Sequence, residues 1–253
     1  MTLLIVFLLR LSFGISAAMA TVSHRQVSSG YFRNHLYVVL GLTGLAALLC
    51  VGRHADAFPY AAAAAVISYV GAVCWLYEAP RVGKTALVVA AGAAAIGLLK
   101  IGNLPGDASE TLSATALGLR QAQPFASGLL TGLVTAAMLL VHWYLNAPGM
   151  NLEPLRRLLR LSNFALALQV IVCGVGIGAQ WQVAGGLTGA WALLIVRWSF
   201  GLAGVAVLLW MAEQTLKIPN TQSATGILYV AVIGTYTGEI MSQVLSAKTT
   251  YPV

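Results

Sequence analysis

The sequence predicts an all-α polytopic membrane protein, a bundle of about eight transmembrane helices with both termini outside. The chain of 253 residues is 59% hydrophobic and only 8% charged, and its mean hydropathy is +0.84. This composition lies well outside that of soluble globular proteins. Apolar runs long enough to cross a bilayer, roughly 17 to 25 residues each, recur about eight times along the chain.

Short polar segments that contain proline and glycine separate these apolar runs. The longest of them, from Gly102 to Pro124, is far too short for a separate soluble domain. We therefore predict a single integral membrane domain over residues 1–253, with spans near 3–22, 35–52, 60–77, 86–104, 124–146, 158–180, 187–212 and 225–246.

The first span has an alternative explanation, because its apolar core is followed by "SAAMA" and resembles a signal peptide cleaved after Ala20. However, no basic residue precedes the core, and Arg10 interrupts it. Cleavage would also place the later basic connections on the wrong side of the membrane. We therefore predict that residues 3–22 form a transmembrane helix.

Basic residues concentrate in alternate connections, which predicts the orientation. The net charge of +7 thus reflects the positive-inside rule, and we expect no nucleic acid as a partner. The odd-numbered connections, expected to be cytoplasmic, hold Arg25, Arg33, Arg81, Lys84, Arg156, Arg157 and Lys217, whereas Arg53, Arg120 and Lys248 lie on the other side.

Three ionisable residues fall inside predicted spans at similar depth. At a rise of about 1.5 Å per residue, Arg10, Arg197 and Glu239 lie about 10 to 15 Å from the outer ends of their spans. The two arginines stand in "RLSFG" and "RWSFG", and we expect them to point into the bundle because small residues share their helix faces. These small residues are Gly14 and Ala17, and Gly201 and Gly204.

An isolated charge inside the membrane costs at least about 2.5 kcal/mol, so such groups normally have partners. Glu239 can neutralise one arginine. The other needs backbone carbonyls, water, another subunit or an anionic ligand such as a carboxylate, a phosphate or a quinone oxygen. A cluster that only fixes helix register is the structural alternative. The predicted ligand or proton site comprises Arg10, Arg197, Glu239, Thr235, Ser242 and Gln243.

Other residues give weaker signals for cofactors. The three cysteines lie in different spans without CxxC spacing, which predicts buried apolar residues and neither a disulfide nor a metal site. His35 and His142 share the predicted inner leaflet and are the weak candidates for a haem. The cofactor stays unidentified: we expect none bound covalently, and quinone is the candidate.

No HExxH, GxSxG or Walker motif occurs, so the sequence indicates a protein that is not an autonomous enzyme. The cytoplasmic stretch "NAPGMNLEPLRRLLRL" carries Arg156, Arg157 and Arg160 into the headgroup region. These arginines predict anchoring to anionic lipid, with docking of a protein partner as the alternative.

Transporters often bind their substrate at discontinuous helices, but no proline falls in the interior of a predicted span. The sequence therefore favours a non-catalytic subunit of an energy-transducing or redox membrane complex, with a buried site for a quinone head group or a proton relay. A secondary transporter of a small anion, with or without proton coupling, and a purely structural scaffold remain the alternatives.

We expect lipid and other membrane subunits, or further copies of the chain, as partners. The compact loops and the lack of a transit peptide make the bacterial inner membrane the simplest location.

Overall fold

The computed structural model describes residues 1–102, 113–147, 149–184, 191–218 and 220–252. Eight helical segments within these residues are long and apolar enough to cross a membrane, which confirms the predicted all-α membrane bundle. The orientation of the termini stays a prediction. The elements are α1 (Thr2–Thr21), α2 (Ser29–Cys50), α3 (Phe58–Leu76), α4 (Pro80–Gly102), α6 (Ala114–Asn146), α7 (Glu153–Ala184), α8 (Trp191–Trp198), η1 (Ser199–Gly204), α9 (Val205–Thr215) and α10 (Thr221–Ser246).

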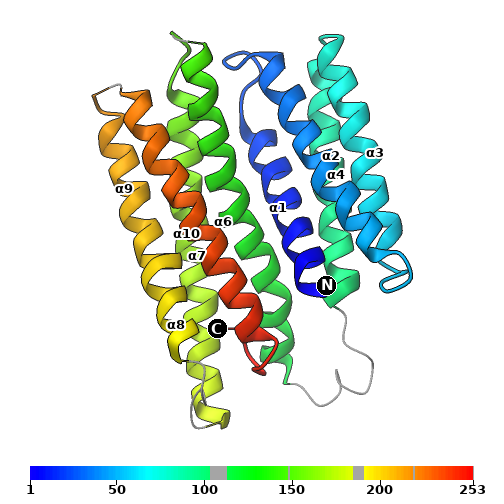
Figure 1. The fold of residues 1–253 in the computed structure, drawn as a ribbon, viewed down its shortest axis with the longest axis vertical. Helices are drawn as coiled ribbons and strands as arrows, with labels where there is room; N and C mark the ends of the chain where they lie inside the picture. The colour runs from blue at the N-terminus through cyan, green and yellow to red at the C-terminus, as the bar shows by residue number, and fades with distance from the viewer. Residues whose placement is uncertain (103–112, 148, 185–190, 219, 253) are drawn as a thin grey trace.

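The helices form two groups that pack side by side (Figure 1). The first half consists of α1 to α4, and the second half consists of α6 to α10. The boundary between the halves is made mainly by α1, which packs along α6 and also contacts α10. Both termini lie toward the lower end of the bundle in this view, which we call the terminal end.

Glycines bring the two halves into close contact. A Cβ atom added to Gly14 of α1 would lie 1.8 Å from the carbonyl oxygen of Gly128 on α6, and Gly132 is equally close to the α1 backbone. Within the second half, a Cβ atom on Gly201 would lie 2.6 Å from the Cα atom of Gly238 on α10. Helix backbones therefore touch beside both buried arginines, as small residues allow.

Two helices are less regular than the sequence predicts. The helix predicted to begin at residue 124 begins at Ala114, where the Ser113 hydroxyl accepts a hydrogen bond of 3.2 Å from the Ala116 amide. Pro124 therefore lies inside α6, so the expectation that no proline falls in the interior of a span is wrong, although α6 continues through it. The predicted span begins only at Pro124 because hydropathy falls in the polar residues before it. The helix continues through them because helix formation requires only backbone hydrogen bonds and a cap.

The seventh span contains the second irregularity. Its middle, Ser199–Gly204, is a π-helix that follows Arg197 almost directly. Such wide turns are rare, and they occur frequently at functional sites. The span nevertheless stays one continuous helix from Trp191 to Thr215.

The outer surface of the bundle is apolar, which is typical of contact with lipid. Large side chains that are more than half exposed include Val66, Phe164, Ile171, Ile195, Val207 and Ile233.

Candidate functional site

A buried ion pair joins the two halves of the bundle. Arg10 of α1 donates from Nη1 to Oε1 of Glu239 on α10, and the two residues are 7% and 1% exposed. The same nitrogen donates to the hydroxyl of Ser127 on α6 at 3.2 Å. Gln243 donates to Glu239 Oε1 at 2.8 Å. Three helices thus converge on this pair.

The ion pair does not use all of its hydrogen-bonding groups. Arg10 Nε and Glu239 Oε2 are buried, and neither has a hydrogen-bond partner among the described residues. Removal of one member of a buried pair leaves an uncompensated charge, which costs about 3–5 kcal/mol. The unused atoms therefore give the pair capacity for a further ligand, a water molecule or a proton.

Arg197 lies apart from the carboxylate. It is 2% exposed on α8, and its Nη2 donates to the Cys173 sulfur at 3.5 Å. Its Nη1 faces Gly238, where an added Cβ atom would lie 3.2 Å away. The two ion pairs among the described residues are Arg10–Glu239 and Arg160–Glu153, so Arg197 has no carboxylate there.

The other predicted site residues take different roles. The Ser242 hydroxyl accepts a hydrogen bond of 3.1 Å from Gln123 of α6, so Ser242 links α10 to α6. The Thr235 hydroxyl instead donates to the carbonyl of Ala231 in its own helix. Ser242 therefore connects α10 to α6, Gln243 supports Glu239 within α10, and the Thr235 hydroxyl bonds only within its own helix among the described residues.

Sequence reasoning missed a polar stripe on α6. Gln123, Ser127, Thr131 and Thr135 recur every four residues and are all buried, at 5% exposure or less. Residues four apart share one face of a helix, and this face lies toward α1 and α10 through Ser127 and Gln123. The spacing was visible in the sequence, but the stripe crosses the predicted start of the span.

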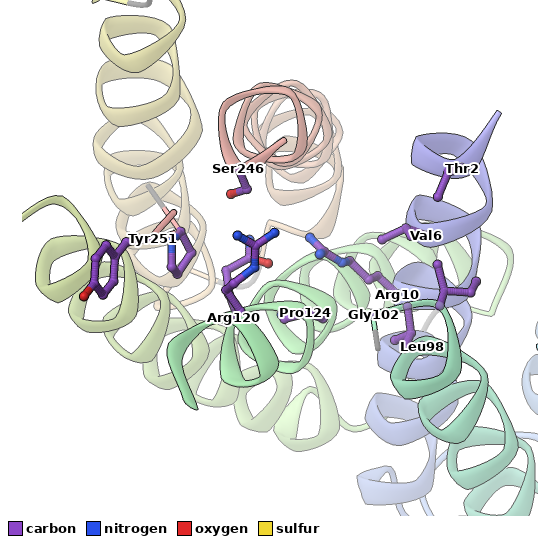
Figure 2. A pocket seen from close by; sticks show the side chains of 12 residues that line it. Thr2, Val6, Arg10, Leu98, Gly102, Arg120, Pro124, Ser246 and Tyr251 are labelled. Carbon is purple, nitrogen blue, oxygen red and sulfur yellow. The ribbon is translucent and has the colours of Figure 1, made fainter. Parts of the chain in front are cut away.

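A pocket of about 200 Å³ lies between the two halves at the terminal end, and we call it the interface pocket. The first half contributes residues of α1 and α4, and the second half contributes residues of α6, α10 and the segment after α10. Figure 2 shows the side chains of Arg10 and Arg120 reaching toward the same space between these helices. The pocket thus extends from the helix ends to Arg10, the member of the buried ion pair that lines it.

Arg120 is a further candidate site residue, which the sequence analysis placed in a connection between spans. Its Nη1 donates to the carbonyls of Thr249 at 3.3 Å and Thr250 at 3.1 Å, which carry no charge. The Ser246 hydroxyl, also in the lining, is buried and has no hydrogen-bond partner among the described residues. The pocket therefore holds two guanidinium groups, one neutralised by Glu239.

The histidines suggested for a haem lie in the half of the membrane away from the terminal end. His35 Nδ1 is 2.6 Å from the carbonyl of Tyr31, and His142 Nδ1 is 3.4 Å from the hydroxyl of Tyr229. No group of three or more His, Cys, Asp or Glu side chains suited to a metal ion occurs within the described ranges. The haem stays a prediction without a geometric argument.

The basic segment at the start of α7 also lies at that opposite end. Arg156 donates from Nη2 to the carbonyl of Leu216 at 3.1 Å, and Arg160 forms an ion pair with Glu153. Arg157 is exposed. Part of this basic segment is therefore engaged in contacts within the chain, and Arg157 is free to meet lipid headgroups.

In comparisons with known proteins, no family model matches the chain, and no curated protein or solved structure matches it either.

Proposed function

We propose that this protein is a secondary transporter of a small anion. The observation that carries the proposal is the position of the interface pocket. It lies between the two halves, it is lined by Arg10 and Arg120, and it ends at the ion pair that links the halves. Guanidinium groups bind carboxylates and phosphates well.

The architecture suits alternating access, in which one bundle rocks against another around a fixed site. The contacts that would have to change lie where α1 packs against α6 and α10. They include the Gly14–Gly128 contact and the bonds from Arg10 to Glu239 and Ser127. A ligand at Arg10 would act directly on the link between the halves.

One helix irregularity weakens the preference for the complex-subunit hypothesis over transport, because that preference depended on the absence of proline from the interior of the spans. Pro124 lines the interface pocket and cannot donate the helical hydrogen bond to the carbonyl of Arg120. The π-helix follows Arg197, the arginine without a carboxylate. Transporters often hold substrates at irregular or broken helices, and Pro124 places an irregularity at the interface pocket within the continuous helix α6. The π-helix lies outside the lining of this pocket.

Glu239 is the proposed proton-coupling group. Its Oε2 has no hydrogen-bond partner among the described side chains. When this carboxylate takes up a proton, Arg10 loses its counter-charge and attracts an anion more strongly. Anion and proton would then bind together, which couples their movement.

The test is uptake by the purified protein in liposomes with an inward proton gradient. The probes are labelled pyruvate, phosphate, sulfate and chloride. We expect at least one to accumulate above protein-free liposomes, Glu239→Gln to abolish the dependence on the gradient, and Arg120→Gln to slow uptake at least tenfold. Arg53→Gln is the matched control, because Arg53 is exposed at the same end of the bundle.

Absence of uptake for all four probes would overturn the proposal. Native mass spectrometry of protein extracted from its own membrane, with an optical spectrum, then separates the two other hypotheses. Stoichiometric partner subunits or a cofactor band would support the complex subunit with a quinone or proton site. A protein without partner subunits and without a cofactor band would support the hypothesis of a purely structural scaffold.

A further inference from the structure

The interface pocket has one charged side and one apolar side. Arg10 and Arg120 contribute the charge, and Gln123 adds an amide. Val6 and Leu98 belong to the apolar wall. Inorganic anions are hydrated on all sides and gain nothing from an apolar wall, whereas an organic anion can bury its carbon skeleton there.

The charge of the pocket is suited to a monoanion. Arg10 is neutralised by Glu239, and within the described part of the chain Arg120 has carbonyl partners and no carboxylate partner. With Glu239 ionised, these three groups carry one net positive charge. A monoanion balances this charge while Glu239 is ionised. When Glu239 takes up the proton proposed above, the same groups carry two positive charges, and the bound monoanion then neutralises one of them.

The volume limits the size of the ligand. An apolar protein cavity of about 150 Å³ holds benzene, and the interface pocket measures about 200 Å³. By proportion, a ligand of roughly eight non-hydrogen atoms fills the pocket. A carboxylate is planar, and its two oxygens match the parallel N–H groups of a guanidinium.

We infer that the interface pocket binds a small monocarboxylate with a short apolar tail. The carboxylate lies between Arg10 and Arg120, and the tail packs on the wall that contains Val6 and Leu98. This inference rests on the proposed transport function and specifies its class of substrate.

The test is equilibrium binding to the detergent-purified full-length protein by calorimetry. The central comparison is benzoate with benzamide, which has the same shape without the charge. Benzoate should bind, and benzamide should bind at least tenfold more weakly. In the series acetate, propionate and butyrate, affinity should rise about fourfold for each added methylene group.

Three variants assign the binding to the pocket. Arg120→Gln should weaken benzoate binding at least tenfold, and Arg120→Lys should weaken it less because the charge remains. Arg53→Gln should leave binding unchanged. The melting temperature without ligand shows whether each variant is folded.

The binding results distinguish an error in the substrate class from an error in the proposed transport function. Binding of phosphate or sulfate but not of carboxylates would overturn the substrate class and leave anion transport standing. Equal binding of benzamide and benzoate would overturn the role of the arginines. If no anion binds the wild-type protein, both proposals are wrong.

Discussion

Substitution of Gly14 by alanine tests the contact between the two halves. The added Cβ atom would lie 1.8 Å from the carbonyl oxygen of Gly128, where ordinary contacts begin at 3.4 Å. Both atoms belong to helix backbones, so α1 and α6 must separate by roughly 1.5 Å, and even a gap of about 1 Å removes up to half of a contact's dispersion energy. Overpacking of this kind costs about 1–3 kcal/mol, and we expect the upper end.

Alanine also favours the helix by about 1 kcal/mol relative to glycine, so the expected net loss is about 2 kcal/mol. For a chain of this size, that corresponds to a fall in melting temperature of about 4–8 °C. Gly92→Ala in α4 is the matched control, because nothing lies within 4 Å of its added Cβ atom. It should keep the propensity gain and raise the melting temperature.

The assay is thermal unfolding of both variants in the same mild detergent, followed by tryptophan fluorescence. Gly14→Ala should melt below the wild type and Gly92→Ala at or above it. Equal stability of Gly14→Ala and the wild type would refute the close approach of α1 to α6, and with it the proposed boundary between the halves.

Two further predictions concern charged residues and use the same unfolding assay. Arg10→Met should lower the free energy of unfolding by about 3–5 kcal/mol because Glu239 loses its buried partner. Adding Glu239→Leu should restore most of this loss. A double variant that is no more stable than Arg10→Met would contradict the ion pair. Arg156→Ala should lower the free energy of unfolding by about 1 kcal/mol, because it removes the hydrogen bond to the Leu216 carbonyl. Arg157→Ala, at an exposed position, should change it by no more than about 0.5 kcal/mol. Equal effects of the two variants would count against the Arg156–Leu216 bond.

The candidate site was only partly predictable. The depth of Arg10 and Glu239 follows from counting helical rises, and the structure brings these two residues together. Arg120 and Gln123 were missed as site residues because their polarity placed them in a connection. Hydropathy measures transfer from water to lipid, whereas these side chains lie against protein and a pocket.

The sequence by itself determined the class of the protein, because a bilayer requires long apolar helices whose backbone groups are satisfied internally. It also determined that buried charges must find partners, since a lone charge in lipid is expensive.

Only the tertiary structure decided which arginine pairs with Glu239. Arg10 and Arg197 have nearly the same local sequence, and their distance to the carboxylate depends on how α1 and α8 pack against α10. Gly14 lets α1 approach α6, and Arg10 then reaches Glu239. Arg197 packs against Gly238 and Cys173 instead. Helix packing is a property of pairs of surfaces, which no single segment of the sequence specifies.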